Sequence, residues 1–94
     1  MYVFSVNAKT KRDIDGFAAD SEVPFIIYIN FKDLFGAEQL CKLYLIKEGF
    51  YDVDIGNRKL IGDKYLKNKK LVAHDKALRE ALESGYTIQL FESH

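Results

Sequence analysis

Cys41 and His74 are the first residues of this chain with the right chemistry for catalysis. A thiolate beside a histidine can act as a nucleophile. Cys41, however, lies on the apolar stripe of a predicted helix, where a thiol is normally an inert core group. His74 immediately precedes a predicted helix start at Asp75, which favours a capping or solvent-exposed histidine. We therefore interpret both residues as structural.

Asp52 and Asp54 are the second candidate. Alternate residues of one strand face lie about 7 Å apart, a spacing that suits acid/base or metal-binding carboxylates. Their alternation with Val53 and Ile55 is also the ordinary pattern of a strand with one buried and one wet face. We favour this second interpretation, so the pair predicts a solvated strand face and not a site.

Other motifs of catalysis or metal binding are absent from the sequence. It has no Gly-rich phosphate loop, no paired-histidine helix motif and no serine elbow. Cys41 is the only cysteine, which excludes an intramolecular disulfide and a four-cysteine zinc site. His74 and His94 lack a spaced histidine partner. We predict that the protein is not an enzyme and holds no cofactor or metal.

The strongest local anomaly is a basic segment, which we define as residues 58–70. Its six basic residues, opposed by Asp63 alone, give it a charge of +5, and they are Arg58, Lys59, Lys64, Lys67, Lys69 and Lys70. Clustered cations bind phosphates, and Tyr65 offers a ring on which a base can stack. The aromatic core of RNA-recognition motifs is absent from the predicted strands. A solvated loop, an acidic protein partner and nucleic acid therefore remain open as interpretations.

Length and charge limit the class of protein. A chain of 94 residues predicts one domain over residues 1–94. Its 14 basic and 14 acidic residues sum to zero net charge, without the basic excess of most nucleic-acid binders. Acidic residues group in 13–22 and 48–54, so we predict a dipolar surface that orients a partner.

Compartment is predicted from what the sequence lacks. The longest apolar run, residues 25–29, is far shorter than the roughly 18 residues of a membrane-spanning helix. A signal peptide would require a basic residue before its apolar stretch and a cleavage site after it. The apolar residues 1–6 have neither, so we do not interpret them as a signal peptide. With a single thiol, these features predict a soluble cytoplasmic protein.

Hydrophobic periodicity predicts the elements that must position these residues. Alternation predicts strands over 2–8, 23–31 and 86–92. Helical spacing predicts helices from Asp33 to Gly49 and from Asp75 to Gly85, with the aspartates as N-caps. The first helix is expected to be amphipathic, with a polar stripe of Glu38, Gln39 and Lys42 in which Glu38 pairs with Lys42.

Three connecting stretches are less regular. A fourth strand around 53–55 reaches Gly56-Asn57, which we interpret as a turn, with a bulge in a longer strand to Ile61 as the alternative. Asp15-Gly16 predicts a type I′ turn between Ile14 and Phe17. Residues 62–73 predict a loop with one helical turn.

The order of elements predicts an α+β fold. A four- to five-stranded mixed or antiparallel sheet with two helices on one face is the ferredoxin-like, split βαβ plan with an extra N-terminal strand. The other face, which we call the open sheet face, is left without a helix. Its predicted partner-binding residues are Val3, Ser5, Ile26, Tyr28, Thr87, Gln89 and Phe91.

The composition of the open sheet face predicts a function. Its mixture of aromatic, aliphatic and small polar groups is typical of a protein interface. Because large apolar patches are uncommon on monomers, we expect it to be covered by another chain, by the N-terminal segment or by the loop 9–22. The leading hypothesis is a small interaction module, of regulator or inhibitor type, that acts by surface complementarity and dimerises through this face. The alternative is nucleic-acid binding through the basic segment.

Overall fold

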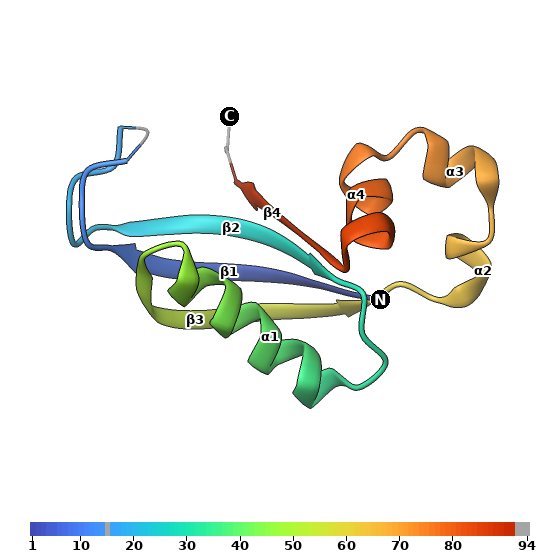
Figure 1. Cartoon of the computed structure of the whole chain (residues 1–94), viewed down its shortest axis with the longest axis horizontal. Coiled ribbons are helices and arrows are strands. Elements are labelled where there is room, and N and C mark those ends of the chain that lie inside the picture. Colours follow the sequence, from blue (N-terminus) through green and yellow to red (C-terminus); the bar gives the residue numbers. More distant parts are fainter. Residues whose placement is uncertain (15, 92–94) are drawn as a thin grey trace.

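A four-stranded antiparallel sheet and four helices make up the computed structural model, which describes residues 1–14 and 16–91. In chain order the elements are β1 (Tyr2–Thr10), β2 (Glu22–Ile29), α1 (Leu34–Lys47), β3 (Phe50–Leu60), α2 (Asp63–Leu66), α3 (Lys69–Ala73), α4 (Lys76–Ser84) and β4 (Tyr86–Leu90) (Figure 1). The predicted α+β class is confirmed. A fifth strand is not seen in the described residues.

The strand order in the sheet is β3-β1-β2-β4. β1 pairs antiparallel with both β2 and β3, so these two run parallel to each other with β1 between them, and α1 connects them. β4 pairs antiparallel with β2, which makes it antiparallel to β3 as well. This order does not confirm the ferredoxin-like arrangement. Because β3 and β4 run in opposite directions, the chain leaves β3 and enters β4 at the same end of the sheet.

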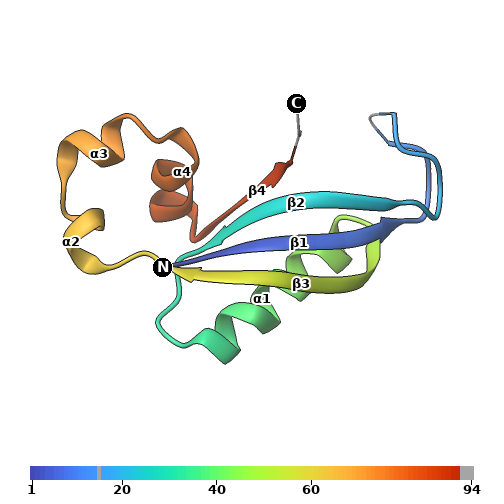
Figure 2. The ribbon, with the colours of Figure 1, turned by 180° about the vertical axis from the view of Figure 1, so that it is seen from behind.

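That connection explains why the two predicted helices do not share a face. Ala37, Cys41 and Leu45 of α1 pack into the main core on one side of the sheet. α4 instead belongs to a second cluster, in which Leu78 packs with Met1 and with Tyr28, whose side chain alternates to the opposite side of β2 from the core. Figure 2 shows α2, α3 and α4 gathered at the end of the sheet beside the N-terminus. Because β3 ends and β4 begins at the same end of the sheet, the segment with α2, α3 and α4 can stay at that end and does not have to cross the face that α1 covers.

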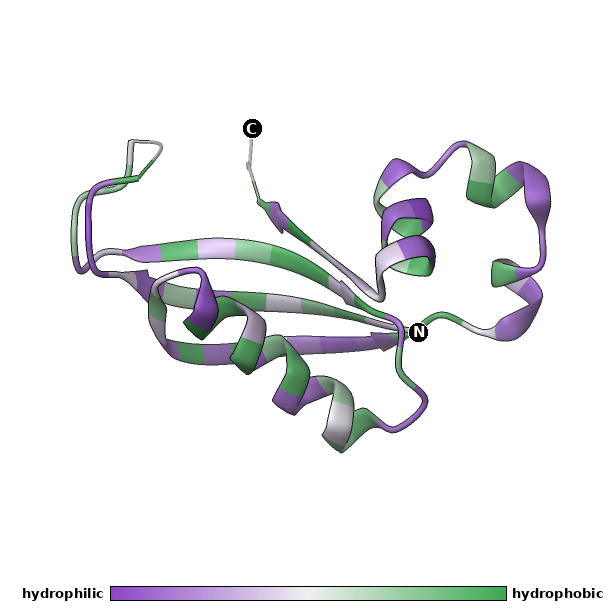
Figure 3. Cartoon of the chain, in the orientation of Figure 1, coloured by the Kyte–Doolittle hydropathy of each residue, from purple (hydrophilic) through white to green (hydrophobic). Residues whose placement is uncertain are grey.

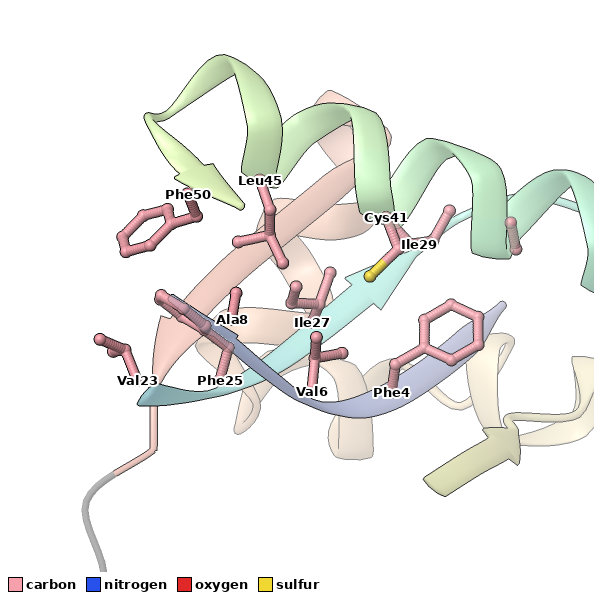
Figure 4. Packing of buried hydrophobic residues seen from close by; sticks show 11 residues of the cluster. Phe4, Val6, Ala8, Val23, Phe25, Ile27, Ile29, Cys41, Leu45 and Phe50 are labelled. Atoms are coloured by element: carbon pink, nitrogen blue, oxygen red, sulfur yellow. The ribbon is translucent and has the colours of Figure 1, made fainter. Parts of the chain in front are cut away.

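The main core is formed by the inward side chains of three strands and α1 (Figure 4). Phe4, Val6, Ala8, Val23, Phe25, Ile27, Ile29, Ala37, Cys41, Leu45 and Phe50 are its buried members. Phe25 and Phe50 meet edge to face, with ring centroids 4.8 Å apart. Burying each large member stabilises the fold by about 1.5–3 kcal/mol before chain entropy is subtracted.

β3 is one continuous strand, so the predicted turn at Gly56-Asn57 is wrong and the bulge is observed. Asn57 pairs with Ser5 and Ile55 with Val6, which leaves Gly56 as an extra residue. A second irregularity lies at Asp52, whose φ of 53° is a conformation that aspartate tolerates. Pairing with β1 on both sides of Gly56 keeps the strand continuous where the local sequence favours a turn.

The predicted caps are observed at the starts of α1 and α4 and at the end of α4. The Asp33 carboxylate accepts a hydrogen bond from the Gly36 N–H (2.8 Å), and Asp75 accepts one from the Leu78 N–H (3.0 Å). Gly85, with φ of 93°, ends α4 in the left-handed region. The helical turn expected within 62–73 is α2, whereas α3 was not predicted.

The loop between β1 and β2 contains the expected short hairpin. Ile14 and Phe17 exchange two backbone hydrogen bonds, of 2.9 and 2.7 Å. Gly16 has a φ of 86°, which suits a tight turn. Asp15, the first central residue of the predicted type I′ turn, lies outside the described residues.

Candidate interaction surfaces

The open sheet face is divided by α4 into a covered and an uncovered half. Val3, Tyr28 and Thr87 lie side by side in register at the end where α4 packs. Thr87 is only 7% exposed, and Tyr28 packs against the cluster that contains Leu78. Because α4 covers this half, these three residues do not form the freely accessible surface that the sequence predicts. The loop 9–22 is not the segment that covers them.

A small cleft remains at the covered end. It has a volume of about 290 Å³ and is lined by Val3, Tyr28, Lys59, Leu60, Ile61, Gly62, Tyr65 and Asp75. Burial raises the pKa of Tyr28 above its ordinary value, and the neighbouring Asp75 and Tyr65 add to the effect. The Tyr28 phenol is therefore neutral at physiological pH and can donate a hydrogen bond.

The uncovered half of the open sheet face is a shallow groove. Ser5, Ile26 and Gln89 follow one another in register across β1, β2 and β4. Exposed Phe91 extends the row beyond β4, and its backbone N–H donates to the Pro24 carbonyl (2.9 Å). The groove has a volume of about 340 Å³. Three of the seven predicted partner-binding residues, Ser5, Ile26 and Phe91, line this groove, and Gln89 lies next to Ile26.

The outer side of α1 is an apolar surface that the sequence analysis missed. Phe35, Leu43 and Ile46 are 69%, 54% and 56% exposed and form what we call the α1 stripe. Figure 3 shows apolar residues recurring along the length of this helix. The signal was present in the sequence, because helical spacing places Phe35 and Ile46 on the same side of the helix as the polar residues Gln39 and Lys42. The expectation of an amphipathic first helix is therefore wrong.

The basic segment does not form one patch. The bulge at Gly56 places Arg58 opposite Phe4, on the side of the sheet that α1 covers, where it forms an ion pair with Glu38. Glu38 thus binds Arg58, and the predicted pair with Lys42 is not among the ion pairs of the described residues. Lys59 lies on the opposite side and lines the small cleft.

The four remaining basic residues of the segment stay together. Lys64 lies on α2, Lys67 caps its end, and Lys69 and Lys70 begin α3. All four are exposed, and the two short helices contact each other. We call this group the α2–α3 lysines.

Cys41 and His74 are not brought together. The Cys41 side chain is fully buried, and Figure 4 shows its sulfur pointing from α1 toward the sheet. Desolvation raises the pKa of this thiol to about 12, so it is protonated at physiological pH. His74 follows α3, and α1 does not contact α3.

Asp52 and Asp54 also lack the surroundings of a site. The Asp52 carboxylate lies 3.3 Å from the Lys9 ammonium and is mostly exposed to solvent. Asp54 is exposed as well. Across residues 1–14 and 16–91, no three histidine, cysteine or acidic side chains are grouped closely enough to hold a metal ion. Nor does any helix in these ranges have the length and hydropathy to cross a lipid bilayer.

Comparisons with protein-family models, with curated proteins and with solved structures find no match to this chain. Its function must therefore be argued from its own surfaces.

Proposed function

We propose that the protein is a non-enzymatic interaction module that acts by surface complementarity and assembles as a homodimer through the α1 stripe. The observation that carries the proposal is the exposure of Phe35, Leu43 and Ile46 on one side of one helix. Large apolar side chains exposed on one helix side together with Gln39 and Lys42 form a mixed apolar and polar surface of the kind found at interfaces. Among residues 1–14 and 16–91, only the sheet packs on α1, and it covers the inner side, so a second chain is the natural cover for the outer side.

Three features favour a second copy as that cover. A two-fold axis through the middle of α1 brings Phe35 of one copy against Ile46 of the other, with both Leu43 side chains near the axis. The two helix dipoles are then antiparallel, which is their favourable arrangement. The chain has no net charge, so overall repulsion between copies is absent.

The expected dimer is concentration-dependent. A 14-residue helix is about 21 Å long, so one helix from each copy buries less area than a standard interface of roughly 800 Å² per partner. We therefore expect dissociation in the micromolar range and not a permanent dimer.

Sedimentation equilibrium between about 10 and 500 µM tests the proposal. Leu43→Glu places a charge at the centre of the stripe and is expected to give a monomer. Leu60→Glu is the matched control, because Leu60 is 62% exposed but lies at the end of β3. Circular dichroism checks that both variants fold.

The outcomes separate the competing surfaces. Dissociation by Leu43→Glu with a dimeric Leu60→Glu supports the α1 stripe. A wild-type chain that is monomeric at the highest concentration refutes the dimer. Dissociation by Phe91→Asp, with Leu43→Glu still dimeric, would instead assign the contact to the uncovered half of the open sheet face.

Nucleic-acid binding remains the alternative, and the α2–α3 lysines are the observation that favours it. Four exposed lysines on adjacent short helices, beside partly exposed Tyr65, can contact phosphates and a base. Charge reversal of Lys67, Lys69 and Lys70 is then expected to abolish binding to single- and double-stranded probes. Absence of binding by the wild type at low salt would exclude this function.

Compartment is part of the same proposal. We place the protein in the cytoplasm, and the free, buried thiol of Cys41 supports a reducing environment.

A further inference from the structure

We propose that the free edge of β4 is a binding site for an extended protein segment with alternating apolar and basic side chains, which adds to the sheet as a further strand. β4 is the last strand of the sheet order, so one of its two edges has no neighbouring strand in the part of the chain that the structure describes. This site lies on a different surface from the α1 stripe and does not depend on dimerisation.

The backbone of β4 supplies the hydrogen-bonding groups for such a strand. Asn30 N–H donates to the Gly85 carbonyl (2.8 Å) and Phe91 N–H donates to the Pro24 carbonyl (2.9 Å). Hydrogen-bonded pairs alternate along an antiparallel ladder, so the odd-numbered residues of β4 face β2. Tyr86, Ile88 and Leu90 consequently direct their N–H and C=O groups to the free edge.

β4 lacks the features that protect the other edge of the sheet. β3 is interrupted by two bulges and carries charged side chains along its length, among them Asp52, Asp54 and Lys59. Such devices prevent unwanted strand pairing. Residues 86–91 contain no charge, no proline and no register shift. The chain therefore leaves one edge available for pairing.

The free edge forms the floor of a slot of about 500 Å³. Glu48 and Phe50 line it on the side of α1, and Glu80 and Ser84 of α4 line it on the other side. The Tyr86 ring is held in place by stacking on Tyr44, with ring centroids 3.9 Å apart. A strand in this slot has apolar neighbours toward α1 and polar or acidic neighbours toward α4.

The charge of the slot selects its occupant. A two-fold axis perpendicular to the sheet at Ile88, which would pair β4 with β4 of a second copy, brings Glu48 toward Glu48 and Glu80 toward Glu80. Like charges brought together in this way oppose self-pairing. Side chains of a strand alternate between its two faces, so basic side chains that point toward α4 meet Glu80 with favourable sign while the apolar ones point toward Phe50. The Glu80 carboxylate also lies 3.9 Å from the Lys76 ammonium, but both side chains of this pair are exposed and such a pair is weak. We therefore commit to a basic-apolar segment of another protein.

Fluorescence anisotropy with a labelled peptide of about ten alternating valine and lysine residues tests the proposal. Glu80→Lys is expected to weaken binding at least about tenfold at low salt, and Glu48→Lys is expected to weaken it less, because Glu48 lies on the side that the valines face. Glu83→Lys is the matched control, because Glu83 is exposed on α4 but does not line the slot, and it is expected to change the affinity less than about twofold.

Two further measurements test the strand geometry. Bound peptide is expected to slow amide hydrogen exchange at Tyr86, Ile88 and Leu90, and a proline in the middle of the peptide is expected to abolish binding. Three results would each overturn the proposal: no binding at about 1 mM peptide, equal binding of a valine-glutamate peptide, or equal weakening by Glu83→Lys and Glu80→Lys.

Discussion

The hydroxyl group of Thr87 offers the sharpest test of the packing between α4 and the sheet. Thr87 is buried, and its Oγ1 atom has no hydrogen-bond partner among the described residues. Thr10 is the other buried threonine, and its hydroxyl donates to the Arg12 carbonyl at 2.7 Å. Replacement of each threonine by valine removes a hydroxyl group from a buried strand position. The two positions differ in whether that hydroxyl has a hydrogen-bond partner.

The expected effects have opposite signs. A buried polar group without a partner costs about 1–3 kcal/mol, and valine replaces it with a methyl group of similar shape that favours a strand. Thr87→Val should therefore raise the free energy of unfolding by about 1–2 kcal/mol. Thr10→Val loses a formed hydrogen bond and should lower it by about 0.5–1.5 kcal/mol.

Urea unfolding followed by circular dichroism measures both changes, with the slope on urea unchanged because little exposed surface is altered. For a chain of this length, 1 kcal/mol corresponds to a shift of about 4–8 °C in Tm. Destabilisation by Thr87→Val to the same extent as Thr10→Val would refute the reasoning, since it would show that the Thr87 hydroxyl is hydrogen-bonded.

Three other predictions concern single side chains. Asp75→Ala should cost about 0.5–2 kcal/mol, measured by urea unfolding, because the first turn of α4 loses its cap. Native-state labelling of Cys41 by a thiol reagent near pH 8 should be slow and limited by unfolding, and rapid labelling would contradict its burial. The raised pKa of Cys41, about 12 in the fold against 9.0 in the unfolded chain, means that the thiol's contribution to stability is complete below pH 9 and is lost as the pH rises toward 12. Cys41→Ala should lack this loss, and an equal pH dependence in both chains would contradict the assignment.

Local signals predicted the elements whose stabilising contacts are local. Asp33 and Asp75 cap helices through hydrogen bonds to N–H groups three residues later, so their role can be read from sequence alone. The pair Ile14 and Phe17 around a glycine turn is equally local. These features need no information about the rest of the fold.

Features that depend on distant pairing were not predictable. Gly56-Asn57 has the composition of a turn, and only its partners Ser5 and Val6 on β1 make it a bulge. The position of α4 depends in the same way on the direction of β4, which the pairing with β2 decides. Half of the open sheet face is covered as a consequence, and Ser5, Ile26, Gln89 and Phe91 stay near one another on the other half, where partner binding remains a prediction.

The zero net charge can now be resolved into local balances. In the sequence, the four acidic residues of the loop 9–22 are opposed by the three basic residues Lys9, Lys11 and Arg12, of which Lys9 also pairs with Asp52. The dipolar surface expected from the sequence therefore lacks a strong acidic end in this loop.

The α2–α3 lysines are the charge excess that remains without such compensation, and they lie at the opposite end of the molecule from the loop 9–22 (Figure 1). Exposed charges act over about 10 Å at 0.1 M salt, so these lysines dominate the field that an approaching partner meets at that end. If a partner binds there, the salt dependence of its association rate should fall with each lysine removed. If it binds the β4 slot, that dependence should instead follow Glu80, because a charge guides association mainly toward its own surface.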